Sequence, residues 1–224
     1  MMKKVVTVKR RVLEANEEHA DRLRRRFTDS GTLVVNLISS PGSGKTSLLE
    51  ATVRTLDGEL RCAVIEGDVA TENDADRIRA LGVPAHQILT GGSCHLDARQ
   101  VVRALDEGGI PEVDVLFIEN VGNLICPTTY DLGEDFKVVV LSVTEGDDKP
   151  VKYPAIFSRA EVAVISKADL LPHVPFRLDA VLAQIESLNP GGTALLTSAL
   201  SGDGMAGWID LLRERLAAKR RTAR

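Results

Sequence analysis

The fold is decided by residues 33–49, LVVNLISSPGSGKTSLL. An apolar run, Leu33 to Ile38, leads into a loop with two glycines, and a helix-like pattern follows at Leu48 and Leu49. In such a loop, successive backbone N–H groups and the helix N-terminus face the α- and β-phosphates of a nucleotide. The lysine reaches the β- and γ-oxygens, and the next hydroxyl binds Mg²⁺. The stretch predicts a P-loop with nucleotide contacts from Pro41, Gly42, Ser43, Gly44, Lys45, Thr46 and Ser47.

The loop departs from the pattern G-x-x-x-x-G-K-[ST] at its first position, where Ser39 replaces glycine. A structural glycine turn that holds no ligand is the alternative interpretation. The place of the loop, directly after an apolar strand and directly before a helix, favours the nucleotide site. We therefore expect Gly42 and Gly44 to let the backbone turn and approach the phosphates closely.

Apolar runs recur along the chain between helix-like stretches. Several runs are β-branched and nearly continuous, which is typical of strands buried on both faces of a parallel sheet. Alternation of strands and helices predicts an α/β P-loop NTPase fold, with a mostly parallel, doubly wound sheet flanked by helices. The expected strands are 33–38, 63–65, 87–89, 113–118, 138–143, 162–165 and 194–196, and amphipathic helices are expected over 96–107, 178–185 and 205–216.

The chain of 224 residues is long enough to bury a full core as one domain. Residues 12–27 carry a sparse apolar stripe among charges and end at Ser30-Gly31, a plausible helix stop. We predict a single GTPase domain over 1–224, with a helical N-terminal extension at 1–31 and the P-loop core at 32–224.

Composition excludes several classes of function. The formal net charge is -4, and the basic residues are spread along the chain, so no electrostatic footprint for nucleic acid is present. No segment approaches the roughly 20 apolar residues of a transmembrane helix. Three cysteines, an odd number in a chain without a secretion signal, argue against a disulfide framework. We expect a cytoplasmic protein without nucleic-acid or membrane partners.

Carboxylates that follow two apolar strands are candidates for the Mg²⁺ side of the site. Asp68 follows the second strand, and Glu119 follows the strand at 113–118. Open α/β sheets place their ligands at these strand ends, and phosphoryl-transfer sites need a carboxylate near Mg²⁺. Gly122 offers a backbone N–H to the γ-phosphate. The alternative for either acid is a surface carboxylate, and Asp74 and Asp76 are expected to cap the next helix.

The base site is predicted at Ser166-Lys167-Ala168-Asp169, at the end of another apolar strand. This element resembles the N/T-K-x-D element with which GTPases read guanine, although Ser166 replaces the usual asparagine. The Asp169 carboxylate accepts bonds from guanine N1–H and the 2-amino group, a pattern that adenine lacks, and the Lys167 stem lies along the base. Thr197-Ser198-Ala199 resembles the backbone loop that reads guanine O6, with Ser198 and Ala199 as contacts. GTP or GDP is therefore expected in preference to ATP.

Two of the three cysteines are candidate metal ligands. Cys94-His95 precedes the helix expected at 96–107, and thiols at a helix N-terminus have lowered pKa values. Cys126 lies four residues after Gly122. Three soft or borderline ligands suit Ni²⁺ or Zn²⁺ but do not complete a structural site of four, so a symmetric dimer is expected to complete it. The alternative is buried thiols beside an exposed histidine, an interpretation that fits Cys62 best.

With these residues in view, the chain resembles the hydrogenase-maturation nickel GTPases of the HypB type, which are SIMIBI-class P-loop GTPases. The resemblance covers nearly the whole chain. It rests on the phosphate loop, on Glu66-Gly67-Asp68, on Gly91-Gly92-Ser93-Cys94-His95-Leu96-Asp97, on Glu119-Asn120-Val121-Gly122-Asn123-Leu124-Ile125-Cys126-Pro127, and on Thr144-Glu145-Gly146-Asp147-Asp148-Lys149-Pro150.

The resemblance implies a GTP-dependent homodimer whose interface holds a metal through Cys94, His95 and Cys126. It also implies delivery of nickel to the large subunit of a nickel-iron hydrogenase, together with a small zinc-containing accessory protein. Some family members carry an additional cysteine-rich or histidine-rich nickel site near the N-terminus. In this sequence His19 is the only histidine before the phosphate loop, and the first cysteine is Cys62, so nickel storage is not expected.

The expected mechanism is a switch in which the γ-phosphate moves the turn at Gly122 and, through it, the ligand Cys126. Hydrolysis is expected to be slow, because the sequence shows no obvious arginine finger or catalytic glutamine. Three alternatives stay open: delivery of nickel to another enzyme such as urease, a P-loop small-molecule kinase, and a metal-binding interaction protein with a purely structural nucleotide site.

Overall fold

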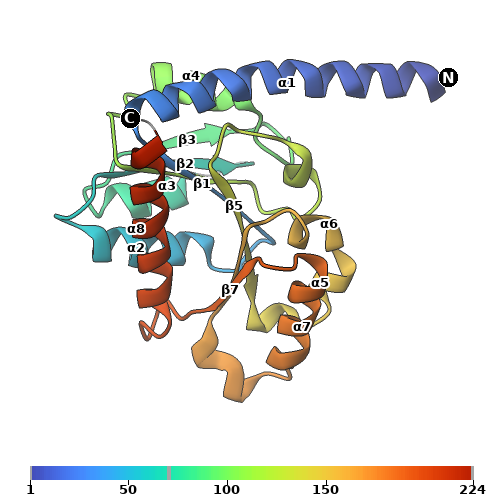
Figure 1. Ribbon diagram of the computed structural model, residues 1–224, viewed down its shortest axis with the longest axis vertical. Coiled ribbons are helices and arrows are strands. Elements are labelled where there is room, and N and C mark those ends of the chain that lie inside the picture. Colours follow the sequence, from blue (N-terminus) through green and yellow to red (C-terminus); the bar gives the residue numbers. More distant parts are fainter. Residues whose placement is uncertain (1, 70–71, 223–224) are drawn as a thin grey trace.

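The computed structural model describes residues 2–69 and 72–222, with side chains from residue 12, and shows a parallel sheet between layers of helices (Figure 1). Within these residues seven strands lie in the order β3-β2-β4-β1-β5-β6-β7, and every neighbouring pair is parallel. The expected α/β P-loop architecture is confirmed. The strands are β1 (Leu33–Ser39), β2 (Cys62–Asp68), β3 (Ala85–Leu89), β4 (Val115–Glu119), β5 (Phe136–Ser142), β6 (Val162–Ser166) and β7 (Thr193–Leu196).

Helices and short 3-10 turns alternate with the strands. This alternation places each strand-to-helix loop at the carboxyl edge of the sheet, where open α/β folds bind their ligands. The α-helices are α1 (Met2–Ser30), α2 (Lys45–Leu56), α3 (Asn73–Arg79), α4 (Ala98–Glu107), α5 (Lys149–Lys152), α6 (Pro154–Phe157), α7 (Leu178–Leu188) and α8 (Met205–Thr222), and the 3-10 turns are η1 (Cys126–Thr129), η2 (Val143–Glu145) and η3 (Ala168–His173).

One face of the sheet is covered by α2 and α8. Alternate residues of β1, among them Val35 and Leu37, belong to a buried cluster with Leu49 of α2 and Trp208 of α8. The Trp208 indole N–H donates to the Thr52 hydroxyl at 2.8 Å, so the polar atom of this large side chain is satisfied inside the core. This packing fixes α2 and therefore the phosphate loop that begins it.

The opposite face is covered in two halves. Helices α1 and α4 lie over β2 and β4, where Leu23 and Val101 share a cluster with Ile118. Helices α6 and α7 lie over β5 and β6, where Val181 shares a second cluster with Ile165. In Figure 1, α1 crosses the top of the molecule beside α4 and extends past the sheet. The strand residues alternate between the two faces, which explains why the runs are apolar throughout.

Helix α1 spans Met2–Ser30 and so reaches beyond the apolar stripe at 12–27 on both sides. Two details differ from the sequence-based expectations. Strand β4 begins at Val115, since Asp114 turns to accept hydrogen bonds from Arg61. The expectation that Asp74 and Asp76 cap a helix is wrong: Glu72 occupies the N-cap of α3, and both aspartates lie in its first turn.

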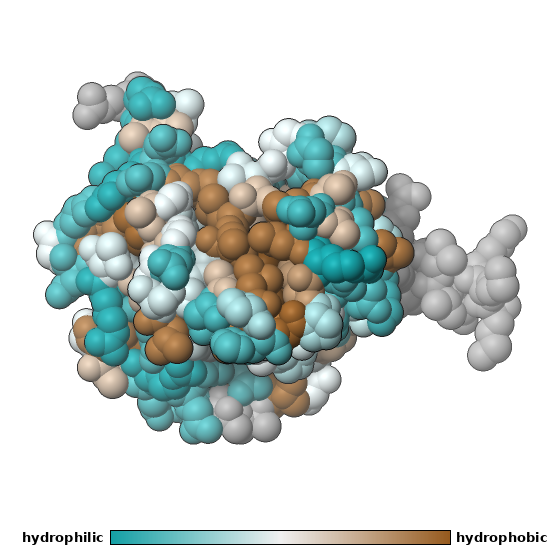
Figure 2. All heavy atoms as spheres, turned by 90° about the horizontal axis from the view of Figure 1, so that it is seen from below, coloured by the Kyte–Doolittle hydropathy of each residue, from teal (hydrophilic) through white to brown (hydrophobic). Residues whose placement is uncertain are grey.

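Strand β7 is an edge of the sheet. Figure 2 views the end of the molecule at the bottom of Figure 1, where the link from β6 to α7 lies, and hydrophobic residues gather in the middle of this face. Leu196 at the end of β7 and Leu200 just after it are exposed to 36% and 87%.

Of the helices described, none has both the length and the apolar character that crossing a membrane demands.

Candidate functional site

The phosphate loop joins β1 to α2 and turns through two left-handed glycines. Gly42 has φ 76° and Gly44 has φ 91°, a region that side chains with a Cβ rarely adopt. Gly44 is also the N-cap of α2, so the first N–H groups of this helix face the loop. The Lys45 ammonium donates to the Ser39 hydroxyl at 2.9 Å. Ser39, which replaces the first glycine of the motif, therefore holds Lys45 at the centre of the loop.

The end of β4 faces this loop through Glu119. Its Oε1 lies 3.1 Å from the Thr46 hydroxyl and 3.6 Å from the Lys45 ammonium. These residues line one cavity of about 440 Å³ together with Asp68, which the sequence also assigned to Mg²⁺. A hydroxyl and carboxylates suit a hard cation such as Mg²⁺. The structure thus brings together the residues predicted for the phosphates and the magnesium.

Glu66 in β2 is a member of this cluster that the site prediction omitted. It pairs in register with Glu119 on the neighbouring strand, so the two carboxyl groups lie close together. Burial and the Glu119 charge raise the pKa of Glu66 well above its usual value. Burial also raises the pKa of Glu119, against the opposing effect of Lys45. Asp74 lines the same cavity and raises both pKa values further.

Two oxygens of Glu66 and Glu119 indicate that a cation binds beside this pair of carboxyl groups. Oε1 of Glu66 and Oε2 of Glu119 are buried, and no donor group of the described residues reaches them. A buried carboxylate oxygen without a donor is costly unless a proton or a cation compensates it. The donor set therefore fits Mg²⁺. The sequence signal that could have found Glu66 is an acid inside a strand that is otherwise apolar.

Gly122, the predicted γ-phosphate sensor, lies against the phosphate loop. A Cβ at this position would approach the Pro41 backbone and ring to between 3.0 and 3.1 Å. The turn after β4 therefore touches the loop that holds the phosphates, and only glycine allows this separation without a shift of one segment.

The predicted base-reading segment is tied to the phosphate loop. The Ser166 hydroxyl donates to the Ser43 carbonyl at 2.6 Å, and the Lys167 ammonium donates to the Gly42 carbonyl at 2.7 Å. Lys167 has φ 59°, a left-handed conformation uncommon for a residue with a side chain. Such conformations persist where the surroundings enforce them, and they cluster at ligand sites.

Asp169 is held by the loop after β7. The Ser198 hydroxyl donates to its Oδ1 at 2.5 Å, and the Ala168 N–H donates to the Thr197 carbonyl at 3.0 Å. A cavity of about 290 Å³ lies beside them and shares Gly44, Ser47 and Lys167 with the phosphate cavity. Ala199 lines this cavity, whereas Ser198 is buried behind it and supports Asp169.

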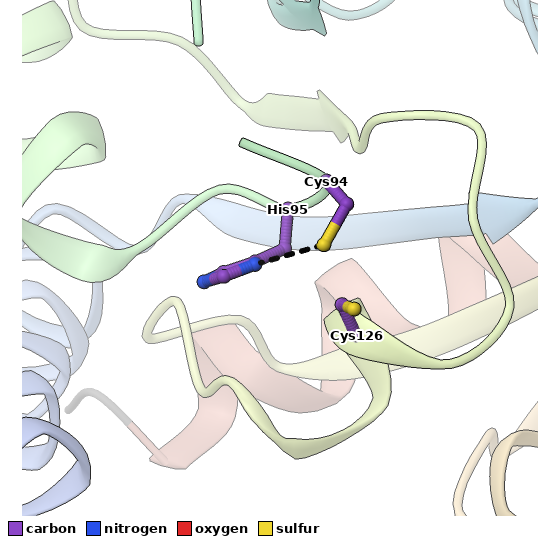
Figure 3. Close-up of side chains that lie close together, drawn as sticks. All are labelled: Cys94, His95 and Cys126. Atoms are coloured by element: carbon purple, nitrogen blue, oxygen red, sulfur yellow. Dashed lines mark hydrogen bonds between the residues drawn. The ribbon is translucent and has the colours of Figure 1, made fainter. Parts of the chain in front are cut away.

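The three predicted metal ligands come together at one point (Figure 3). Cys94 and His95 lie on the loop before α4, and Cys126 begins η1 on the opposite side. Their ligand atoms all lie within 4.8 Å of one another, and the Cys94 sulfur is 3.7 Å from Nδ1 of His95. All three side chains are half-buried, so a partner surface can reach them.

The surroundings of this cluster favour metal binding. Burial lowers the pKa of His95, which keeps the imidazole in the neutral form that metals require. The His95 ring packs on Tyr130 with centroids 3.8 Å apart, which restricts its orientation. Asp97 closes a capping box with Gln100 at the start of α4 and so fixes the end of the loop.

This arrangement defines the class of protein: the chain is a P-loop GTPase of the SIMIBI type. The family model described as "CobW/HypB/UreG, nucleotide-binding domain" matches residues 33–195. The hydrogenase maturation factor HypB of Escherichia coli K12 is 49% identical over 207 residues, which cover 92% of this chain and 71% of the relative. The chain therefore belongs to the HypB family, and the resemblance seen in the sequence is confirmed.

Two further relatives come from Helicobacter pylori. Its hydrogenase/urease maturation factor HypB is 41% identical over 219 residues, covering 96% of this chain and 90% of the relative. The crystal structure of HypB from this organism in complex with nickel superposes with a TM-score of 0.85 at 40% identity, covering 94% of this chain and 97% of that one.

Proposed function

We propose that this chain is a GTP-binding and GTP-hydrolysing metallochaperone that delivers nickel during maturation of the large subunit of a nickel-iron hydrogenase. The observation that carries the proposal is the convergence of Cys94, His95 and Cys126 within 4.8 Å, on loops adjoining the nucleotide site. Thiolate and imidazole ligands suit Ni²⁺ and also Zn²⁺. The nickel complex of the H. pylori relative favours nickel as the cargo.

The nucleotide half of the function uses the cluster around the phosphate loop. Lys45 would bind the β- and γ-phosphates, and Asp169 would read guanine. Thr46, Asp68 and Glu119 would hold Mg²⁺, which when bound neutralises charge on the phosphates. The cavity that Lys45, Thr46, Asp68 and Glu119 line supports the phosphate and magnesium roles, and Asp169 lines the adjoining cavity. Hydrolysis is proposed to be slow, with no activating residue assigned.

The switch would run from Gly122 to Cys126. Because Gly122 lies against Pro41, a γ-phosphate that attracts the Gly122 N–H moves the turn after β4. The Asn123 amide oxygen accepts from the N–H groups of Ile125 and Cys126 at 2.8 and 3.4 Å, so the segment between sensor and ligand is short and tightly turned. GTP would assemble the metal site, and hydrolysis would loosen it.

A homodimer formed in the GTP-bound state would complete the metal site. Three ligands from one chain leave coordination positions that the same residues of a second copy fill across a two-fold axis. Ile125, beside Cys126, is 65% exposed, as expected of a residue that such an interface covers. The proposed partners are a small zinc-containing accessory protein and the hydrogenase large subunit.

A different nickel client is the nearest alternative, because the H. pylori relative is named a hydrogenase/urease maturation factor. A small-molecule kinase is the other alternative, and it should prefer ATP, so competition between GTP and ATP for the site separates it from the proposed function.

We further propose that residues 1–224 form one GTPase domain, with a helical extension at 1–31 and the core at 32–224, and that this protein works in the cytoplasm.

The test is a nickel titration of the protein with GDP and with a non-hydrolysable GTP analogue, with the oligomeric state read in the same samples. Tighter nickel binding and dimerisation with the analogue are expected. Equal affinities and an unchanged monomer would sink the switch, because coupling requires a difference between the two states. Lys45→Ala should abolish the analogue's effect. If it dimerises and transfers metal normally, the nucleotide site is only structural.

A further inference from the structure

The turn that follows β4 and the loop that carries Cys94 and His95 are joined by a buried side chain, that of Asn120. This residue lies one position past Glu119 and is 1% exposed. Its backbone N–H donates to the Leu37 carbonyl at 2.9 Å, which anchors it to β1 just before the phosphate loop.

The Asn120 amide oxygen accepts two hydrogen bonds from different segments. One comes from the Leu96 N–H at 3.2 Å, directly after His95, and the other from the Val121 N–H at 3.0 Å, directly before Gly122. The amide nitrogen donates to Oδ1 of Asn36 at 3.3 Å, which sets the orientation of the group. One oxygen atom therefore connects the proposed phosphate sensor with the metal-binding loop.

A second contact joins the loop that carries Cys94 and His95 to the end of β2, through the Leu96 side chain. A Cβ on Gly67 would lie 2.8 Å from the Leu96 side chain, so Leu96 packs directly on the backbone between Glu66 and Asp68. The residue that follows His95 is thus fixed to the magnesium side of the site by packing and to the γ-phosphate side by a hydrogen bond. Both contacts are buried, and a buried N–H that loses its acceptor is costly.

We propose that Asn120 is a positioning residue that couples the nucleotide state to the metal site by holding Leu96 and Val121 on one amide oxygen. The inference rests on the proposed function, to which it adds a second route. When the γ-phosphate displaces the turn at Val121 and Gly122, the shared oxygen moves with it, and Leu96 follows. Cys94 and His95 then respond to GTP along with Cys126.

The test compares the ratio of Ni²⁺ affinities in the GTP-analogue and GDP forms between wild type and Asn120→Ala. Allosteric coupling usually corresponds to roughly 5–150-fold in affinity, and the wild-type ratio should fall in this range. In Asn120→Ala the ratio should fall severalfold toward one without reaching it, because neither N–H keeps its acceptor and only the route from Gly122 to Cys126 remains. Asn120 also lines the phosphate cavity, so nucleotide affinities are measured alongside and both nucleotides are kept at saturating concentration.

A matched control is Asn16→Ala. The Asn16 amide oxygen also accepts from the start of α4, from the Ala98 N–H at 2.8 Å, but its amide nitrogen donates to the Asp131 carbonyl and does not reach Val121. This variant should shift both affinities alike and keep the wild-type ratio. If Asn120→Ala does not fold, Asn120→Ser replaces it, because a shorter hydroxyl cannot accept both bonds and the ratio should fall in the same way.

The outcomes separate the two proposals. Equal nickel affinities in the wild-type forms overturn the proposed switch itself. A wild-type ratio that persists in a folded Asn120 variant overturns only the role of Asn120. A ratio lost equally in Asn16→Ala also overturns it, because the effect then reflects any disturbance of the start of α4.

Discussion

The Ser198 hydroxyl donates a 2.5 Å hydrogen bond to the carboxylate of Asp169, from a loop almost thirty residues further along the chain. This bond uses one lone pair of Oδ1, so both carboxylate oxygens can still accept from a base, and Ala168 is fixed to the same loop through the Thr197 carbonyl. Guanine is therefore expected to be read by a carboxylate with little freedom to move.

Asp169→Asn should weaken GTP binding and favour xanthosine triphosphate. The amide accepts one of the two base hydrogen bonds and donates toward the other position, where guanine presents a donor and xanthine an oxygen. Loss of one charge-assisted bond, worth about 1.5–3 kcal/mol, corresponds to about a 10- to 150-fold loss in GTP affinity. Competition of GTP, xanthosine triphosphate and ATP for the wild-type and variant sites measures this change in base preference. If ATP competes as well as GTP at the wild-type site, the guanine assignment is wrong.

Cys94→Ala should lower the Ni²⁺ affinity by at least about tenfold, since one of three ligands is lost. The matched control is Cys62→Ala. The Cys62 thiol is buried at the start of β2, and burial raises its pKa to about 12, so it is not a thiolate ligand at neutral pH. Nickel titration of the control should match wild type. A tenfold loss in Cys62→Ala would instead indicate that the metal site depends on the whole fold.

The fold was largely predictable from the sequence because the strands are buried on both faces. Val138 and Val139 face opposite layers, yet both are apolar, so the whole strand appears as one apolar run. Helix ends were harder, because they depend on local bonds. Glu72 is the N-cap of α3 although aspartate is a better capping residue type, and Asp74 and Asp76 lie in the first turn.

The site could be predicted where a motif or an unusual residue type marked it, as at Lys45 and Cys94. Residues that act through neighbours gave no such signal. Glu66 matters because the strand pairing places it beside Glu119, a relationship between residues more than fifty positions apart. Asn120 matters because Leu96 donates to it from another loop. Such contacts follow from strand order and register, which short motifs do not encode.

Glu66→Gln should stabilise the nucleotide-free protein at neutral and alkaline pH. The pKa of Glu66 is raised above 4.5 by burial and by Glu119. A carboxyl with a raised pKa gives its full stability below the unfolded pKa, and this contribution is lost as pH rises toward the folded pKa. Glutamine is uncharged throughout. The variant should therefore melt above wild type at pH 8, with the difference shrinking toward pH 4.5, when both are measured in chelator without nucleotide.

The opposite pH trend would contradict this view of the acidic pair. A melting difference that is constant from pH 4.5 to 8 would mean that Glu66 ionises as freely in the folded protein as in the unfolded chain. In that case the effect of the substitution would come from packing alone.

Asp114 is expected to stabilise the fold at a place remote from the nucleotide and metal sites. It precedes β4 and accepts hydrogen bonds from the backbone and guanidinium of Arg61, and from Arg220 in α8. These donors lower its pKa to about 2, although burial opposes them. The carboxylate therefore joins the link before β2 to the last helix, at the edge of the sheet opposite the nucleotide.

Asp114→Asn should lower the free energy of unfolding at pH 7 by about 1–2 kcal/mol, a value reduced because both arginines are about half exposed or more and solvent screens them. A lowered pKa means that the contribution is present above the unfolded pKa of 3.8 and is lost as pH falls through about 2. The difference in urea denaturation between wild type and variant should thus be full at pH 7 and shrink below pH 3.8. Asp210→Asn, which removes an exposed acid that pairs with Arg213 on α8, should change stability by no more than about 0.5 kcal/mol. Equal losses in the two variants would show that Asp114 contributes no more than a surface charge.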